Sequence, residues 1–288
     1  MLRSRMASVI ALLIMGGVLP VFAAEFFVDA KNGNDDWDGT AETAASDVET
    51  SKVGPKRSLS AVAALVNLST DMLTTVTVLP GCYGEDEGTD TTMEFTGTNG
   101  GKRLARVVLT NVTSKRNVVF RSKYGKDVTE IVGKSDSNSL SGRYGCGPNA
   151  VGGTLGSSSS AATYSAFCGF TFRDCRSCDS TTDNVDRGGA ASLVTLVDCV
   201  VSNNAATRGG GGQAIHAFRC RFTANRVVGT SYGAAVNSAQ LSNCLIDHNI
   251  GGAALSYSTA VVNCTIVDND CSTGTFYSES GSSAGYKT

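Results

Sequence analysis

The sequence predicts an all-β chain that coils as a single-stranded parallel β-solenoid. Three observations predict it: one motif recurs about every 21 residues, each copy alternates apolar and polar positions, and no helical segment separates the copies. The composition agrees, because 33 of 288 residues are glycine, 4 are proline and 17% are charged. A hydrophobic content of 41% argues against disorder, and a formal net charge of −2 leaves no basic excess for binding nucleic acid.

The repeat is defined by the motif Cys-x-apolar-x-x-Asn. Its four cysteines are 21, 24 and 20 residues apart, at Cys199, Cys220, Cys244 and Cys264. The motif closes each time on an asparagine, at Asn204, Asn225, Asn249 and Asn269. Between these copies a Gly-Ala motif recurs at Gly189, Gly212, Gly233 and Gly252, and a looser early copy spans 169–175. Neighbouring strands lie about 4.8 Å apart, so we expect equivalent side chains to stack in columns, with the asparagines as an amide ladder.

The chain contains ten cysteines, which in a secreted protein would suggest disulfides. Stacked positions, however, hold their Cβ atoms about 4.8 Å apart, whereas a disulfide requires about 3.8 Å. We therefore expect the four motif cysteines to be buried free thiols, with disulfides along the column as the alternative. The pairs Cys175–Cys178 and Cys146–Cys168 stay open, and a zinc site at Cys175 and Cys178 lacks a second ligand pair.

The first segment, 1–24, predicts a secretory signal peptide. Arg3 and Arg5 give a positive start, an apolar run follows over 9–18, and Ala23 and Ala24 suit cleavage. A membrane anchor is the alternative, but the run is shorter than the roughly 20 apolar residues that a bilayer requires. We therefore expect a secreted, extracellular or cell-surface protein with no transmembrane segment in the mature chain.

Three further segments follow the signal peptide. We expect an N-terminal cap and the first irregular coils over 25–150, regular repeats over 151–271, and a Ser/Gly-rich tail, uncapped or truncated, over 272–288. A short amphipathic helix over 58–67, with Ser58 as its N-cap, is placed to cover the first coil. Gly145 to Ser160 predicts an extended loop. Strands are expected at 26–29, 76–83, 106–110, 118–121 and 130–132.

Several N-terminal motifs resemble those of a known superfamily. They are Phe27-Val28-Asp29, Gly33-x-Asp35-x-x-Asp38-Gly39 and Val76-x-Val78-x-Pro80-Gly81-x-Tyr83. Together they resemble the start of secreted right-handed parallel β-helix proteins of the pectate-lyase-like superfamily. The Gly-Gly-Ala and Phe-x-x-Asn motifs, such as 188–190 and 222–225, resemble the repeats of polymorphic outer membrane proteins. The resemblance implies a right-handed coil and an extracellular or cell-wall glycan as partner, but the scaffold hosts many activities.

No catalytic residue can be carried over from that superfamily. A polygalacturonase of this type would contain a Gly-His-Gly element, and neither His216 nor His248 is flanked by glycine. Catalysis is therefore not evident, although a polysaccharide lyase or a glycoside hydrolase would be the expected enzyme class. The chain also supplies one candidate calcium site, because Asn34, Asp36 and Asp38 have the spacing of the start of a calcium loop. Its twelfth position is Ala45 instead of glutamate, and the alternative is an Asx-stabilised turn.

Two sets of residues are candidates for contact with a substrate. His248 and Asp268 occupy the same motif position in consecutive repeats and Asp247 is adjacent, so they are candidates for acid–base work, with a solvated surface pair as the alternative. The second set is an expected outward stripe of polar residues in front of the cysteines. It comprises Asp174, Asp198, Arg219, Asn243 and Asn263, which suit a sugar-binding face or a merely solvated one.

The expected function is a secreted β-helix protein that binds or acts on extracellular polysaccharide. One alternative is a non-catalytic adhesin-type repeat protein at the cell surface. A second alternative is a calcium-dependent polysaccharide lyase, and calcium is the one cofactor that the sequence points to.

Overall fold

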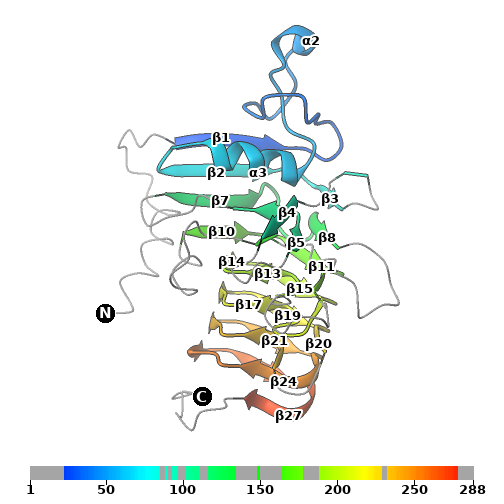
Figure 1. Ribbon diagram of the computed structural model, residues 1–288, viewed down its shortest axis with the longest axis vertical. Coiled ribbons are helices and arrows are strands. Elements are labelled where there is room, and N and C mark those ends of the chain that lie inside the picture. Colours follow the sequence, from blue (N-terminus) through cyan, green and yellow to red (C-terminus); the bar gives the residue numbers. More distant parts are fainter. Residues whose placement is uncertain are drawn as a thin grey trace.

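The computed structural model describes residues 23–84, 88–89, 93–96, 102–109, 116–133, 148–149, 164–177, 188–228 and 232–277. These residues are predominantly β and form three large parallel sheets, one antiparallel pair and two helices. Figure 1 shows the strands stacked as rungs along the long axis, from β1 (Ala23–Val28) at one end to β27 (Asp270–Tyr277) at the other. The all-β prediction with parallel strands is confirmed at this level.

Sheets 1 and 2 each collect one strand from successive turns of the chain, and sheet 3 collects one or two. Sheet 1 contains β1, β2 (Leu73–Val78), β7 (Asn117–Ser122), β10 (Ser165–Cys168), β14 (Thr195–Val197), β18 (His216–Phe218), β22 (Gln240–Ser242) and β25 (Ala260–Val262). Sheet 2 contains β3 (Gly81–Tyr83), β8 (Thr129–Val132), β11 (Thr171–Arg173), β15 (Val200–Ser202), β19 (Arg221–Thr223), β23 (Leu245–Asp247) and β26 (Thr265–Val267). Sheet 3 contains β6 (Val107–Val108), β9 (Pro148–Asn149), β12 (Arg176–Ser177), β13 (Ala191–Ser192), β16 (Ala205–Ala206), β17 (Gly212–Gln213), β20 (Arg226–Val227), β21 (Gly233–Asn237), β24 (Ile250–Ser256) and β27. The antiparallel pair joins β4 (Met93–Thr96) to β5 (Lys102–Ala105).

The chain visits the three sheets in turn, and the register places equivalent repeat positions side by side. Val201 of β15 pairs with Phe222 of β19, which pairs with Ile246 of β23, which pairs with Ile266 of β26. All four side chains face inward, and the first three are completely buried. This order of strands is compatible with a β-solenoid, because each repeat lies against the next along its length.

Residues with positive φ mark the corners between the sheets. Between sheets 1 and 2 lie Gly169, Asp198, Arg219, Asn243 and Asn263, with φ of 75, 54, 53, 55 and 51°. Between sheets 2 and 3 lie Asp174, Asn203, Ala224, His248 and Asp268, with φ of 60, 54, 55, 56 and 52°. Left-handed backbone is uncommon for residues other than glycine, and asparagine and aspartate tolerate it best. The polar residues that the sequence repeats before its cysteines and asparagines therefore turn the chain.

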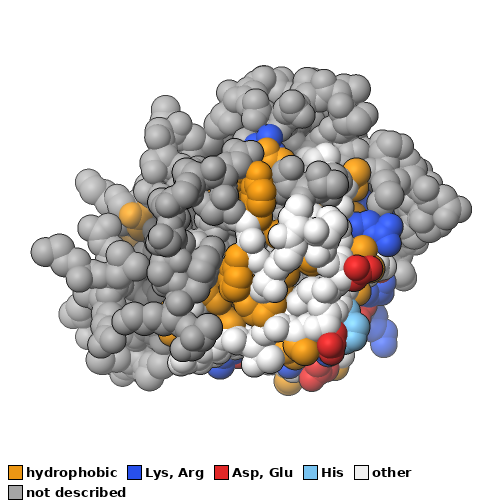
Figure 2. All heavy atoms as spheres, turned by 90° about the horizontal axis from the view of Figure 1, so that it is seen from below, with side chains coloured by type: hydrophobic (Ala, Val, Ile, Leu, Met, Phe, Trp, Pro, Cys, Tyr) orange, Lys and Arg blue, Asp and Glu red, His pale blue; other side chains and the backbone are white. Residues whose placement is uncertain are grey.

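The N-terminal end is covered by a helix, as the sequence predicts. Helix α3 (Leu59–Leu68) begins at Ser58, whose Oγ accepts a hydrogen bond from Ala61 N–H at 3.1 Å. The helix packs against β6, the last strand of sheet 3, and buries Val62 and Val66 in the common core. The second helix, α2 (Val48–Ser51), is short and has no buried residue. At the opposite end, Figure 2 shows hydrophobic side chains lying open at the centre of the rung.

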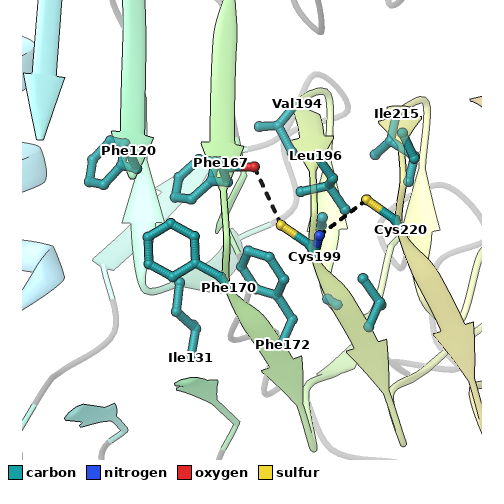
Figure 3. Close-up of a cluster of buried hydrophobic side chains, with 14 of the residues drawn as sticks. Phe120, Ile131, Phe167, Phe170, Phe172, Val194, Leu196, Cys199, Ile215 and Cys220 are labelled. Atoms are coloured by element: carbon teal, nitrogen blue, oxygen red, sulfur yellow. Dashed lines mark hydrogen bonds between the residues drawn. The ribbon is translucent and has the colours of Figure 1, made fainter. Parts of the chain in front are cut away.

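The core is a continuous file of inward side chains (Figure 3). Phe120 and Phe167 stack with ring centroids 4.7 Å apart, and Phe172 meets Phe167 edge-on at 6.1 Å. Further along the axis, smaller residues such as Cys199 and Cys220 take over the file. Aromatic rings therefore fill the section around β7, β10 and β11, and thiols fill part of the section beyond it.

The predicted cysteine column is confirmed. The Cys199 N–H donates to Cys220 Sγ at 3.4 Å, and the Cys244 N–H donates to Cys264 Sγ at 3.4 Å. All four are free thiols, with Cys199, Cys220 and Cys244 buried and Cys264 half-buried. Burial raises the pKa of the Cys220 thiol well above 9.0, which suits a neutral, inert side chain.

The early copy of the motif is shifted relative to the expectation. Phe170 occupies the position of Cys199, because Thr171 pairs with Val200. Cys175 occupies the position of Asn204 and donates its backbone N–H to Asn204 Oδ1 at 2.9 Å. Cysteine thus appears at two different positions of the coil, and aligning the copies on cysteine alone misplaces this one.

Two other expectations need correction. The Gly-Ala motifs do not form one column, because Gly212 pairs with Val236 and Ala191, while Gly233 pairs with Ala253. In the earlier coils this part of sheet 3 consists of two separate strands, β16 and β17 or β20 and β21. In the later coil the single strand β24 takes their place, and the register shifts between β21 and β24. The strand β27 also extends into the predicted tail, as far as Tyr277.

Other predictions fall where the structure describes little or nothing. The signal peptide lies outside the described residues except for Ala23 and Ala24, and so do Cys146, Cys178 and most of 145–160. Among the described residues, no helix is both long enough and apolar enough to cross a membrane.

Candidate functional site

The outer surface of sheet 2 and its two corners carries most of the candidate residues. Alternate residues of each strand point outward there, so polar side chains of successive coils lie in columns. We call this surface the polar face. It comprises Glu130, Arg173, Ser202, Arg221, Thr223 and Asp247 on the strands, and Asp174, Asp198, Asn203, Arg219, Asn243, His248, Asn263 and Asp268 at the corners.

The corner between sheets 1 and 2 keeps four of the five residues of the predicted stripe together. Arg219 donates from Nε and Nη2 to the two carboxylate oxygens of Asp198, at 2.6 and 2.5 Å. The same guanidinium lies 4.2 Å from the ring centroid of Phe218, which faces outward on β18. The carboxylate of Asp198 raises the pKa of Arg219, so this cation is permanent. Asn243 and Asn263 continue the same corner without a charge.

Asp174 does not belong to that stripe. The structure places it at the other corner, where Asn203 Nδ2 donates to Asp174 Oδ1 at 2.5 Å. Arg173 links it to the strand face, donating from Nη1 to Asp174 Oδ2 at 2.7 Å and from Nε and Nη2 to Glu130 at 2.9 and 2.8 Å. In the coil of β10 and β11, the position equivalent to Asp198 is occupied by Gly169, because the early motif copy is shifted.

The most structured polar group on the face is formed by Arg221, Asp247 and His248. Arg221 donates from Nε and Nη2 to Asp247 at 3.0 and 2.6 Å, and His248 Nδ1 lies 2.9 Å from Asp247 Oδ2. The Asp247 side chain is 5% exposed, whereas those of Arg221 and His248 are 49% and 62% exposed. The hydrogen bonds from Arg221 hold the pKa of Asp247 below its usual value of 3.8, so it is a carboxylate at neutral pH.

This group orients His248 toward solvent. A buried carboxylate at Nδ1 fixes the ring, and His248 Nε2 makes no hydrogen bond to the described residues. The predicted neighbour Asp268 is confirmed one coil away, since the His248 N–H donates to the Asp268 carbonyl at 3.1 Å. The bond is between backbones, however, and the carboxylate that engages the imidazole is Asp247.

The candidate calcium loop lies apart from the polar face, near α3. Asn34 Oδ1 accepts the Asp36 N–H at 2.9 Å, and Asp38 accepts from Thr40 N–H and Oγ1 at 2.9 and 2.8 Å. Asp35, between them, accepts a hydrogen bond at its Oδ2 from Oγ of Ser58, the N-cap of α3, at 2.7 Å. These oxygens serve turns and a helix cap, and the described residues contain no group of three or more His, Cys, Asp or Glu side chains that could hold a metal.

The charge of the polar face limits its ligands. Three arginines, at 173, 219 and 221, face five carboxylates, at Glu130, Asp174, Asp198, Asp247 and Asp268, which leaves two negative charges with His248 neutral. The ion pairs occupy both partners, so the face offers fixed hydrogen-bond donors and acceptors without a basic patch. Such a surface suits an uncharged, hydroxyl-rich ligand better than a polyanion.

The sequence could not single out Arg221, Arg173 and Glu130. Arg221 and Asp247 lie 26 residues apart and meet diagonally across neighbouring coils, two strand positions out of step. The signal was present, because an arginine and an aspartate occupy outward positions of adjacent repeats. A search for equivalent positions alone does not detect diagonal partners.

Comparisons with known proteins supply no relative. No family model matches the chain, and neither the curated proteins nor the solved structures contain a match. The resemblance to pectate-lyase-like proteins and to polymorphic outer membrane protein repeats therefore rests on the quoted motifs and on the parallel sheets.

Proposed function

We propose that this protein is a secreted right-handed parallel β-helix of the pectate-lyase-like type that binds neutral extracellular or cell-wall polysaccharide on the polar face. The three parallel sheets and the in-register repeats support the coil. Its right hand follows from the general preference of parallel crossovers. The signal-like sequence at 1–24 supports secretion.

The main support for glycan binding is the polar face itself. Its side chains recur at the strand spacing of about 4.8 Å over the coils from β8 to β26. Intramolecular ion pairs hold the arginines in place, so little side-chain entropy is lost when a ligand binds. A glycan chain laid along the axis would meet similar donors and acceptors at each coil. Phe218 beside Arg219 adds a partly exposed ring on which a sugar could stack.

The proposal predicts that Arg219 contributes to glycan binding and that an equivalent arginine elsewhere does not. Arg219→Ala should weaken binding of a neutral oligosaccharide about tenfold, the value of one hydrogen bond to a charged group. Arg121→Ala is the matched control, because Arg121 pairs with Glu25 on sheet 1 with almost the same exposure, 51% and 48% against 49% and 49%.

The measurement is a glycan array followed by titration calorimetry on the best neutral ligand. Oligosaccharides of xylan, mannan, galactan and cellulose are the neutral probes, and polygalacturonate and alginate are the charged ones. Preference for a neutral probe, lost in Arg219→Ala and kept in Arg121→Ala, is the expected result. Equal weakening by both variants, or binding to the polyanions alone, would contradict the proposal.

One observation favours an enzyme as a second candidate. His248 is held at Nδ1 by the buried Asp247 carboxylate, which is the geometry of an oriented general base. The test is turnover of the bound glycan, followed by release of reducing ends and by absorbance of unsaturated sugars, in the wild type and in His248→Gln. Turnover abolished by His248→Gln would support the enzyme, and binding without turnover would leave the binding protein.

A further inference from the structure

The connection between sheets 1 and 2 is longer in one coil than in the others. In the coil of β7 and β8 it spans residues 123–128. Two residues make the same connection in the other described coils, such as 79–80 before it and 169–170 after it. The additional residues have to leave the path that the other coils follow. We call this connection the 123–128 turn, and it stands at the N-terminal end of the polar face.

This turn carries the most exposed aromatic side chain among the described residues. Tyr124 is 66% exposed, whereas the next aromatic residue in order of exposure, Phe276, is 37% exposed. Val128, in the same turn, is 45% exposed. Aromatic rings provide a large apolar contact area, so a ring that stands in water is available to a ligand that offers an apolar face.

Hydrogen bonds tie the backbone of the 123–128 turn to the coil. The Gly125 N–H donates to Ser122 Oγ at 2.9 Å, and Ser122 Oγ donates to the Gly125 carbonyl at 3.0 Å. Thr171 Oγ1 of the next coil donates to the Lys126 carbonyl at 2.9 Å. The ring of Tyr124 is therefore carried on a backbone that is already held in place, so less entropy is lost when a ligand stacks on it.

Lys123 lies over one face of the Tyr124 ring. Its Nζ is 5.3 Å from the ring centroid, and it forms an ion pair with Glu42, which precedes α2 in the chain. The hydrogen bond to Glu42 raises the pKa of Lys123, so the cation stays charged at neutral pH. Because the cation lies over one face of the ring, a ligand stacks on the other face.

The 123–128 turn lies beside the corner that carries the Asp198–Arg219 ion pair. It packs directly on the next coil, since a Cβ added to Gly169 would lie 3.3 Å from Gly125 Cα. Gly169 occupies the position equivalent to Asp198 but has no side chain. It therefore places no side chain between Tyr124 and the ion pair.

We propose that Tyr124 is a terminal stacking site for the neutral glycan. The inference rests on the proposed function and adds to it the line that the glycan follows. One pyranose ring places its C–H face on Tyr124, and hydroxyl groups further along the chain meet Asp198 and Arg219. Three coil steps separate the turn from Arg219, which is roughly 14 Å at about 4.8 Å a step. A disaccharide is too short to contact both, and a longer oligosaccharide gains affinity by reaching Tyr124.

The experiment compares a disaccharide and a hexasaccharide of the best neutral glycan by titration calorimetry. Tyr124→Ala should weaken hexasaccharide binding about tenfold and should not change that of the disaccharide. Tyr124→Phe should rescue the affinity, because stacking uses the ring and not the hydroxyl. Leu68→Ala is the control, since Leu68 is 80% exposed at the end of α3 and should not affect either ligand.

The outcomes separate this inference from the proposed function. An unchanged hexasaccharide affinity in Tyr124→Ala, beside a weakened one in Arg219→Ala, would overturn the stacking site alone. Equal weakening of the disaccharide and the hexasaccharide would also overturn it, because Tyr124 would then not mark the far end of a longer ligand. Failure of the wild type to bind any neutral glycan would overturn both. The urea midpoints of all variants should match that of the wild type, because both side chains are exposed.

Discussion

At the scale of single residues, the buried asparagines hold consecutive coils together. Asn225 is fully buried, and its side chain makes four hydrogen bonds. Its Oδ1 accepts from the backbone and side chain of Asn204, and its Nδ2 donates to the Val201 carbonyl and to Asn249 Oδ1. A corner in the middle of a core would otherwise leave backbone groups without partners, which is costly.

Asn225→Ala should therefore destabilise the protein strongly. It leaves the buried Asn204 N–H without an acceptor, and we expect a loss of about 2–3 kcal/mol in the free energy of unfolding. Asn243→Gly is the control, because Asn243 is exposed at a corner with φ of 55°, where glycine is unstrained. Its effect should stay within about 0.5 kcal/mol. Urea unfolding measures both, and similar losses in the two variants would argue against the ladder.

Asp247 predicts a pH dependence of stability. Its folded pKa lies below the unfolded value of 3.8, because Arg221 donates to the carboxylate. The stabilisation is therefore present above pH 3.8 and is lost as the pH falls through the folded pKa. Asp247→Asn should lower the urea midpoint at pH 7 and make it less sensitive to acid between pH 5 and about pH 2. An unchanged acid dependence in this variant would contradict the assigned ion pair.

At the scale of elements, the stacked strand positions of the parallel sheets form columns, and the cysteine column has one chemical character over several repeats. The cysteine column is a file of small free thiols held at the strand spacing. Burial raises the pKa of Cys168, on β10, to about 12, so this thiol is a poor nucleophile.

The thiol column predicts a pattern of chemical reactivity. Cys199 and Cys220 should resist iodoacetamide in the native protein and react completely in guanidinium, because both are buried and neither is in a disulfide. Peptide mapping by mass spectrometry without reduction measures this. Recovery of a disulfide-linked Cys199–Cys220 peptide would instead support the alternative of covalent bridges along the column.

At the scale of the whole molecule, the periodic part of the sequence predicts the structure well. The four late repeats specify the cysteine column, the asparagine ladder and the inward apolar file, and all three are confirmed. The helix over 58–67 and its Ser58 cap could also be predicted, because capping is a local interaction. These features depend on residues that are close in sequence or one period apart.

Features that depend on loops of unequal length could not be predicted. The Gly-Ala motifs fall out of register because the connections before β17 and β21 differ from those of the later coils. Asp174 changes corner because its coil starts with Phe170 in place of cysteine. The Arg221–Asp247 pair was also missed, since it joins residues that are two strand positions out of step.

The central claim is that a neutral glycan lies along the outer surface of sheet 2. Methyl NMR tests it most directly, since Val200 and Leu245 point outward on that sheet, while Val119 points outward on sheet 1, three strands away from Phe218, and Val201 points into the core. Titration with the best neutral oligosaccharide should shift the methyl resonances of Val200 and Leu245 and leave those of Val119 and Val201 in place. Shifts at Val119 without shifts at Val200 and Leu245 would contradict the account.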